Sequence, residues 1–171
     1  MTLPTINQSA VRWLWLSLLV FVLDIATKQM ASAWLIYARP VEILPVLDFT
    51  LLHNPGAAFS MLANQPGWQR CFLSLIAAGV SVMLVVWIVR TPREQVWLPV
   101  ALALILGGAV GNLFDRVVYG YVIDFISVHY NGRFFPAFNI ADSAISVGAA
   151  MMIVDVIRDM RRGASANNSS S

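Results

Sequence analysis

Charged residues are scarce in this chain: Asp, Glu, Lys and Arg make up 12% of its 171 residues, whereas apolar types make up 58%. A soluble domain carries about twice that charged fraction, so the composition excludes the soluble class and indicates a membrane protein. The single cysteine, Cys71, excludes an internal disulfide. Two distant histidines, His53 and His129, make a poor case for a metal site. The small net charge of +2, without a basic cluster, argues against a nucleic-acid partner.

Long uncharged stretches are the main feature that the chain does have. Residues 71–89 and 96–114 contain no charged side chain. At about 1.5 Å per residue each reaches roughly 28 Å, close to the roughly 30 Å of a bilayer core. Two further apolar stretches carry only isolated charges, Asp142 in one and Asp24 with Lys28 in the other. We therefore predict a single integral-membrane domain, 1–162, with four spans at about 13–35, 71–89, 96–116 and 137–157.

The distribution of basic residues predicts the orientation. Four spans place both chain ends on one side of the membrane. On the opposite side, Lys28 and Arg116 lie within or at the ends of spans and have acidic neighbours. Without these two, basic residues are in excess on the side of the termini, which favours termini in the cytoplasm. The basic residues on the side of the termini are Arg12, Arg90, Arg93, Arg158, Arg161 and Arg162. Those counted on the opposite side are Arg39, Arg70 and Arg133.

The segment between the first two spans contains short strand-like stretches. They lie at 41–44, 48–52 and 57–60, separated by Pro45 and by a turn at 54–56. We predict a small β platform, about 40–61, at the outer membrane surface. The Ser/Asn-rich end of the chain, 163–171, is expected to be a disordered tail.

Two aspartates, Asp124 and Asp142, lie in otherwise apolar sequence. An ionised carboxylate in hydrocarbon costs several kcal/mol, so an intramembrane acid is a functional candidate. Either acid alone could be satisfied by backbone amides, and Asp142 suits the N-terminus of a helix. Both, however, fall at the same outer depth, and the sequence between them, centred on 131–133, can fold back as a loop. We therefore predict that the two carboxylates form a pair.

Other polar residues fall at the same depth. Asp24 and Lys28 share one helix face, because they are four residues apart. They are either an ion pair at the outer interface or groups that brace a site or contact a lipid headgroup. Asn112, Asp115 and Arg116 end the third span, either as a helix-capping cluster with an Asp–Arg pair or as support for the site. The small residues before them, 107–111, would let another helix backbone approach closely.

Five short motifs follow one another along the chain. They are Asp24-x-x-x-Lys28, Asn54-Pro55-Gly56-Ala57-Ala58-Phe59-Ser60, Gly107-Gly108-Ala109-x-Gly111-Asn112-x-x-Asp115-Arg116, Val122-x-Asp124-Phe125-Ile126 and Phe135-Pro136-Ala137-Phe138-Asn139-Ile140-Ala141-Asp142-Ser143. With these motifs, over roughly 13–158, the chain closely resembles the bacterial lipoprotein signal peptidases, the type II signal peptidases. No motif position departs from the family pattern, although Pro55 stands where the family often has threonine.

The resemblance implies an aspartyl endopeptidase of the bacterial inner membrane, with four transmembrane helices and a small β-cradle on the periplasmic side. It implies no metal or cofactor. The substrate would be a prolipoprotein whose lipobox cysteine carries a diacylglyceryl group, cut just before that cysteine. We expect a monomer whose other partners are membrane lipids. The matching catalytic positions are Asp124 and Asp142; those for substrate binding or support of the pair are Asp24, Lys28, Asn54, Gly56, Asn112, Asp115, Arg116, Asn139 and Ala141.

Two other classes of protein compete with the peptidase. Intramembrane carboxylates also serve proton relays, so a small proton- or ion-coupled carrier is one alternative. Four spans are few for a carrier, and the acids gather at one depth instead of stepping through the bilayer. A structural assembly protein is the other alternative, but it would not need two acids at equal depth. The sequence therefore favours the peptidase.

Overall fold

The computed structural model describes residues 9–56 and 68–168. Within these ranges four helices are long and apolar enough to cross a membrane, and a small antiparallel sheet accompanies them. The predicted fold class is therefore confirmed. The helices are the short 3-10 helix η2 (Ala10–Trp13), α1 (Leu14–Trp34), α2 (Trp68–Arg90), α3 (Trp97–Val118) and α4 (Ile140–Asn168).

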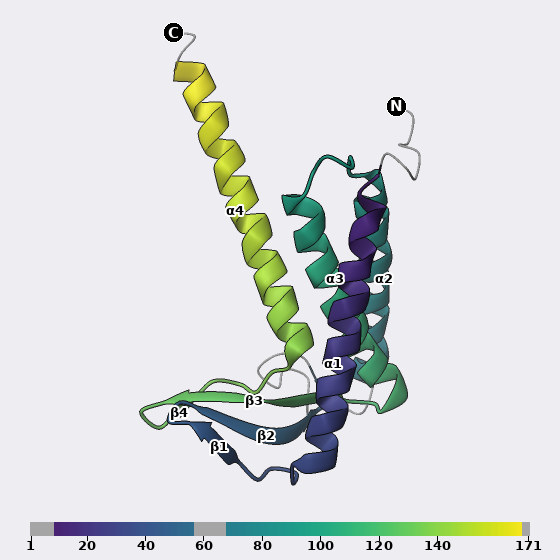
Figure 1. The fold of residues 1–171 in the computed structure, drawn as a ribbon. Helices are drawn as coiled ribbons and strands as arrows, with labels where there is room; N and C mark the ends of the chain where they lie inside the picture. The colour runs from purple at the N-terminus through teal and green to yellow at the C-terminus, as the bar shows by residue number, and fades with distance from the viewer. Residues whose placement is uncertain (1–8, 57–67, 169–171) are drawn as a thin grey trace.

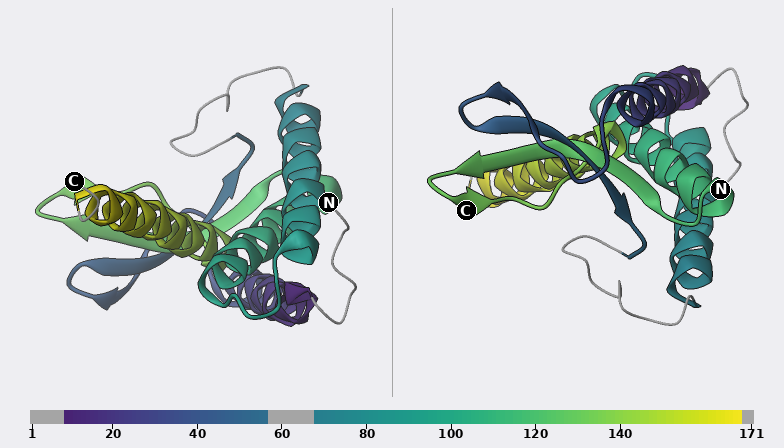
Figure 2. Two further views of the ribbon diagram at one scale, coloured as in Figure 1. Left: turned by 90° about the horizontal axis from the view of Figure 1, so that it is seen from above. Right: turned by 90° about the horizontal axis from the view of Figure 1, so that it is seen from below.

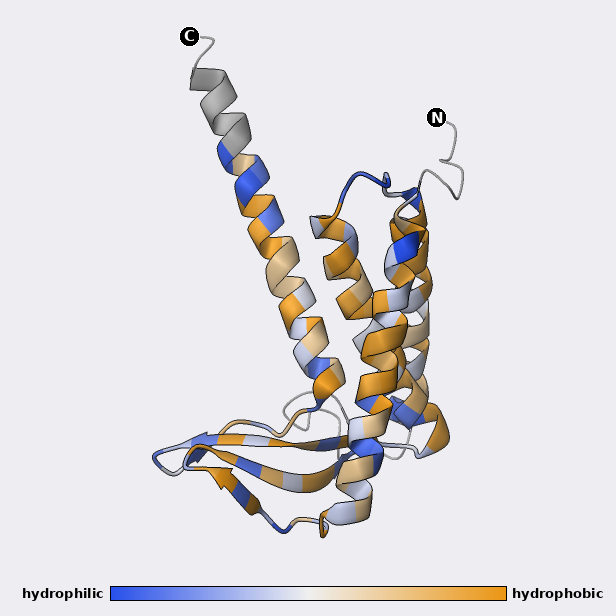
Figure 3. Ribbon diagram, viewed as in Figure 1, coloured by the Kyte–Doolittle hydropathy of each residue, from blue (hydrophilic) through white to orange (hydrophobic). Residues whose placement is uncertain are grey.

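The long helices extend from the sheet towards the same end of the molecule, and the C-terminal part of α1 runs down beside the sheet (Figure 1). The start of α1 and the end of α4 lie at the end of the molecule away from the sheet, and α4 rises directly from it. The views along the helices show that the sheet extends beneath α4 (Figure 2). Apolar residues dominate the middle of the helices, whereas hydrophilic residues lie at both ends: where the helices approach the sheet, and at the far end of α4 and in the loop before α3 (Figure 3). The apolar part of the bundle is therefore bounded by polar residues at either end.

Helix α3 is the central helix and contacts α1, α2 and α4. Its glycines permit this close packing. A Cβ atom at Gly107 would lie 2.7 Å from Ser17 O of α1, and one at Gly111 would lie 2.5 Å from Asp24 Oδ2. A Cβ at Gly108 would collide with the carbonyl oxygen of Ala141 on α4. The predicted close approach of helices at these small residues is confirmed.

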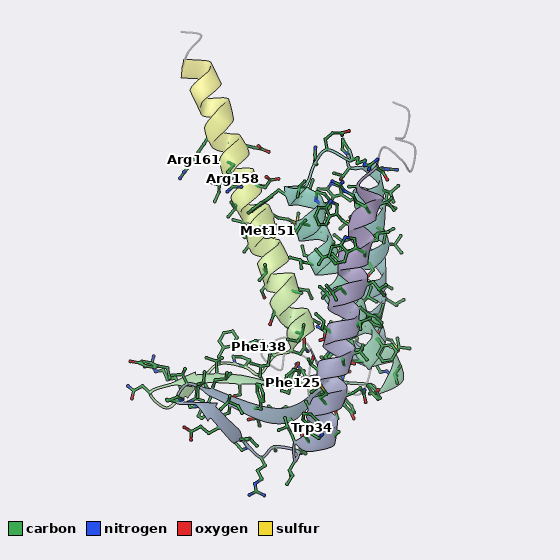
Figure 4. The ribbon with its side chains drawn as sticks, viewed as in Figure 1. Trp34, Phe125, Phe138, Met151, Arg158 and Arg161 are labelled. Carbon is green, nitrogen blue, oxygen red and sulfur yellow. The ribbon has the colours of Figure 1, made fainter. Side chains whose placement is uncertain are left out.

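At the other end of the bundle, α3 is tied to α4. The indole Nε1 of Trp97 donates to the backbone carbonyl of Met151 at 2.8 Å. The guanidinium carbon of Arg158 lies 4.6 Å from the centre of a Trp97 ring, within range of a cation–π contact. These contacts hold α4 against α3 along a second part of its length, far from the sheet (Figure 4).

The sheet has the strand order β1-β2-β3-β4, with all neighbours antiparallel. Strands β1 (Val41–Leu44) and β2 (Leu47–Asn54) match the first two predicted stretches. The third predicted stretch, 57–60, lies outside the described residues. Strands β3 (Val122–Tyr130) and β4 (Arg133–Phe134) were not predicted. They form a hairpin whose turn residues, Asn131 and Gly132, have φ values of 48° and 75°, as a two-residue hairpin turn requires.

The apolar run around Asp124, for which no helix or strand was predicted, is part of strand β3. One expectation needs correction. Helix α4 continues to Asn168, although disorder was expected from Gly163. Extending an existing helix fixes one residue for each hydrogen bond gained, and Ala164 and Ala166 are strong helix formers. Residues 169–171 lie outside the described residues.

Candidate active site

A cavity of about 1270 Å³ lies between the sheet and the first turns of α4. Asp124 enters it from β3 and Asp142 from the first turn of α4. Phe138, which also lines it, lies beside the start of α4, where the chain leaves the sheet (Figure 4). The fold therefore brings the two predicted aspartates to one cavity, as the sequence led us to expect.

The side chain of Asn139 connects both aspartates. Its Nδ2 donates to Asp124 Oδ1 at 2.7 Å, and its Oδ1 accepts the backbone N–H of Asp142 at 2.9 Å. The second bond is the usual N-cap interaction with the third residue of a helix. Asn139 is completely buried. One amide thus caps α4 and at the same time sets the position of Asp124.

A further amide donates to each carboxylate, which gives Asp124 two such donors and Asp142 one. Asn54 Nδ2 lies 3.2 Å from Asp124 Oδ2, and Asn112 Nδ2 lies 2.8 Å from Asp142 Oδ1. Burial, followed by the neighbouring charge of Asp142, raises the pKa of Asp124 to about 7. Asp124 therefore retains a proton close to neutral pH, where an ordinary aspartic acid is fully ionised.

A buried ammonium group lies behind the pair. Lys28 Nζ is 2.7 Å from Asp24 Oδ2, 2.8 Å from Asp115 Oδ2 and 3.0 Å from Asn112 Oδ1. The side chains of Lys28 and Asp24 are completely buried. The predicted Asp24–Lys28 ion pair is therefore present, but it is buried within the protein, which contradicts an exposed position at the interface and contact with a lipid headgroup. Because an ammonium group only donates hydrogen bonds, Lys28 fixes the oxygen of the Asn112 amide and turns its NH₂ towards Asp142.

The two carboxylates that bind Lys28 also hold the backbone beside each aspartate. Asp24 Oδ1 accepts the N–H of Ala141 at 2.9 Å, one residue before Asp142. Asp115 Oδ2 accepts the N–H of Ile123 at 3.1 Å, one residue before Asp124. The helix α1 residues Asp24 and Lys28 are thereby linked to both elements that carry the pair.

Arg116 completes the polar cluster. Its guanidinium donates to the carbonyl oxygens of Asn112 and Gly56, at 3.2 Å in each case. The expected alternative of a capping Asp115–Arg116 pair is wrong, since the ion pair of Asp115 is with Lys28. Arg116 nevertheless lines the cavity with Asp124 and Asp142.

All the residues singled out in the sequence are therefore gathered in one network, although their roles remain predictions. Sequence reasoning missed a group of cavity residues on the sheet: Asp48, Thr50, Ser127, Phe134 and Phe135. The sequence does contain a signal for part of this group. Along β2, every second residue is apolar or aromatic, and the residues between are Asp48, Thr50, Leu52 and Asn54. A period of two places them on one face of a strand.

The sequence and the structure both have close relatives. The family model for signal peptidase II matches residues 16–158. A lipoprotein signal peptidase of Acinetobacter baumannii is 57% identical over 143 residues, 84% of this chain and 81% of the relative. A lipoprotein signal peptidase of Pseudomonas paraeruginosa is 52% identical over 157 residues, 91% of this chain and 93% of the relative.

Two solved structures of bacterial membrane enzymes have the same fold. One superposes with a TM-score of 0.78 at 29% identity, covering 87% of this chain and 89% of the other. The second has a TM-score of 0.76 at 27% identity, with 86% and 94% covered. Together with the matched family model, these similarities confirm the resemblance seen in the motifs. The chain belongs to the signal peptidase II family and is a peptidase of a bacterial membrane.

Proposed function

We propose that Asp124 and Asp142 are the catalytic pair of an aspartyl endopeptidase that removes the signal peptide from prolipoproteins. The bond cut would be the one just before a cysteine that carries a diacylglyceryl group. The observation that carries the proposal is that both carboxylates line one cavity, where Asn139 donates to the carboxylate of Asp124 and accepts the backbone N–H of Asp142. Two neighbouring carboxylates that share a proton can supply an acid and a base together.

The surroundings suggest how the proton is shared. Burial and the charge of Asp142 raise the pKa of Asp124 to about 7, which keeps the proton on Asp124 near neutral pH. Asp142 lies in the first turn of α4, where the helix dipole favours a negative charge. In the proposed mechanism Asp124 is therefore the acid and Asp142 the base. The apparent titration steps belong to the pair.

The reaction then requires no covalent intermediate. Asp142 takes a proton from water as the water oxygen attacks the scissile carbonyl carbon, and Asp124 gives its proton to the carbonyl oxygen. Breakdown of the tetrahedral intermediate returns a proton from Asp142 to the leaving amine and the hydroxyl proton to Asp124. The products are the free signal peptide and a mature chain that begins with the lipidated cysteine.

The remaining residues would position the pair or the substrate. We assign Asn54, Asn112 and Asn139 to orienting the carboxylates, because each donates an amide N–H to one of them. Asp24, Lys28, Asp115 and Ala141 support them from behind. Arg116 lines the cavity and donates to the carbonyl oxygen of Gly56, so the arginine can hold the substrate backbone.

The membrane supplies part of the positioning. We place the sheet at the periplasmic face of the inner membrane and both termini in the cytoplasm, since Arg158 and Arg161 lie at the end of α4 away from the sheet (Figure 4). A diacylglyceryl group in the outer leaflet would hold the cysteine at the depth of the pair, which lowers the entropic cost of alignment. The enzyme would act as a monomer surrounded by lipid.

The test replaces each acid by its neutral isostere. Asp124→Asn and Asp142→Asn should each lower kcat on a diacylated peptide in detergent by about 10³-fold or more, because either change removes the shared proton or the base. Asp159→Asn, an exposed acid on α4, is the matched control and should retain wild-type turnover. Normal turnover by a folded Asp124→Asn or Asp142→Asn protein would refute the proposal.

A further inference from the structure

The cavity extends beyond the catalytic pair along one face of the sheet. Asp48 and Thr50 of β2 and Ser127 of β3 line this extension, which we call the sheet arm, and Phe134 and Phe135 form its wall. The three polar residues are only 8–9% exposed. A buried polar surface inside an otherwise apolar protein indicates a place where polar groups are bound.

An irregularity in β3 places the sheet arm on the same face as Asp124. The consecutive N–H groups of Phe125 and Ile126 both donate to Phe138 O, at 3.1 and 2.9 Å. Two residues opposite one is a β-bulge, which shifts the alternation of side chains by one position. Asp124 and Ser127, three residues apart, consequently both face the cavity. Without the bulge they would point to opposite faces.

The cavity also extends in a second direction, along α4. Ser143, Ile145, Ser146 and Val147 line that part, and they belong to a helix able to span the membrane. One arm thus follows a helix able to span a membrane, and the other follows a sheet surface that carries Asp48, Thr50 and Ser127. A prolipoprotein has the same two parts on either side of the cleaved bond: an apolar signal helix and a polar mature chain.

We infer that the sheet arm binds the first residues of the mature lipoprotein in an extended conformation, and that Asp48 selects among them by charge. This inference rests on the proposed function. A strand rises about 3.3 Å per residue, so Ser127 and its cross-strand partner Asp48 lie roughly 10 Å, or three residues, beyond Asp124. The affected position is therefore about the third residue of the mature chain, counting the cysteine as the first.

The chemistry of the arm sets the direction of the preference. Asp48 Oδ2 lies 3.2 Å from His129 Nε2, and these side chains are 12% and 22% exposed. No Lys or Arg lines the sheet arm among the described residues. A mature chain with a Lys at the affected position would find an acceptor in Asp48, whereas an Asp there would meet a like charge in a partly desolvated site. The hydroxyls of Thr50 and Ser127 would form hydrogen bonds with the backbone peptide groups of the substrate, whatever its sequence.

The experiment is a series of diacylated peptides with Lys, Asn or Asp placed in turn at the second to fifth mature positions. With the wild-type enzyme, kcat/KM for the Lys peptide should exceed that for the Asp peptide by about fivefold at the third or a neighbouring position, on the scale of a partly exposed charge pair. Equal values at all four positions would overturn the inference. This comparison uses the wild-type enzyme alone.

A charge-neutral variant then locates the effect. Asp48→Asn should reduce the Lys-to-Asp ratio by at least about threefold, whereas Glu94→Gln, an exposed acid in the α2–α3 loop, should leave the ratio as in the wild type. A ratio unchanged by Asp48→Asn would overturn the assignment to Asp48. Failure of the wild-type enzyme to cleave even the Asn peptides would instead contradict the proposed function, so the two failures are distinguishable.

Discussion

Lys28 Nζ lies 2.8 Å from Asp115 Oδ2, and both side chains are buried. The same ammonium binds Asp24, and each of these two carboxylates accepts a backbone N–H from the residue that precedes Asp124 or Asp142. A single buried charge therefore stabilises the start of α4 and the start of β3 together. The relative position of Asp124 and Asp142 depends on a lysine that does not line the cavity.

Replacing Lys28 by Met should lower kcat by at least about 100-fold with a smaller effect on KM, since misplacement of the pair by about 1 Å has a cost of this order. Burial raises the pKa of Asp124, and the Lys28 charge partly offsets that rise. Loss of Lys28 should consequently move the alkaline limb of the kcat/KM profile to higher pH. A profile and kcat equal to those of the wild type would contradict the positioning role.

The control for Lys28→Met is a second substitution that removes one of the two carboxylate charges left without Lys28. Breaking a buried ion pair costs about 3–5 kcal/mol, because the remaining charge is left uncompensated. Lys28→Met combined with Asp115→Asn should therefore unfold at a higher temperature in detergent than Lys28→Met alone. Its activity should stay low, which separates the loss of positioning from a loss of folding.

The fold was largely predictable where hydrophobicity alone decides it. The uncharged stretch 71–89 identified α2 because a membrane span needs about 20 apolar residues. The hairpin of β3 and β4 was not predicted, although Asn131-Gly132 between β-branched and aromatic residues is a strong hairpin signal. The apolar run at 122–126 can be a buried strand or part of a membrane span by composition, and only tertiary packing separates the two.

The site was predictable in its members but not in its connections. Asp24 and Lys28 share a helix face by spacing alone, yet the sequence could not show that Lys28 also reaches Asp115, since that contact joins α1 to α3. The same holds for Asp115, whose sequence neighbour Arg116 was the expected partner. Ser127 of the sheet arm could not be predicted, because the sequence does not reveal the β-bulge that turns this β3 side chain towards the cavity.

Asn139 offers a test that separates capping from orientation. Asn139→Ser keeps a good N-cap residue for α4. The serine side chain is too short to reach Asp124 Oδ1, to which the Asn139 amide donates at 2.7 Å in the wild type. We expect nearly wild-type thermal stability and a kcat lowered by about 10- to 100-fold, the usual effect of losing one orienting group. Asn139→Ala should show the same kcat and lose a further ~1 kcal/mol of stability. Full activity of Asn139→Ser would exclude the orienting role.

The raised pKa of Asp124 predicts the pH dependence of cleavage. In the proposed mechanism the pair needs one shared proton, and burial together with the charge of Asp142, which raises the pKa of Asp124 to about 7, keeps that proton in place up to about this pH. Above that value both carboxylates ionise, so kcat/KM of the free enzyme should fall about tenfold per pH unit. A steady-state profile that stays flat from pH 6 to 9, in a detergent that leaves the protein folded, would be incompatible with this arrangement.

The lipid anchor predicts a requirement on the substrate. A peptide without the diacylglyceryl group must find the cavity from bulk solution, whereas the lipidated peptide is confined to the plane of the membrane. We expect kcat/KM to fall by at least about 100-fold without the lipid, because the unanchored peptide must lose more translational and rotational entropy to align with the pair. The comparison uses one peptide sequence with and without the lipid, in the same vesicles. Equal rates would exclude a positioning role for the anchor.

The pH dependence of stability gives a test of the site that does not involve catalysis. Because the pKa of Asp124 is raised from 3.8 to about 7 on folding, the native state binds more protons than the unfolded state between about pH 4 and 7. Stability contributed by this group is therefore present at low pH and is lost as the pH rises through 7, by up to about 4 kcal/mol.

Asp124→Asn cannot ionise at this position, so its melting temperature relative to the wild type should increase from pH 5 to pH 8. Tryptophan fluorescence during thermal unfolding in detergent measures the difference, and exposed Asp159→Asn provides the baseline for a lost surface charge. In Asp142→Asn the neighbouring charge that helps to raise the pKa of Asp124 is absent, so the stability of that variant should vary less with pH than that of the wild type. If Asp124→Asn and the wild type had parallel pH dependences, Asp124 would titrate normally in the folded protein and could not hold the shared proton.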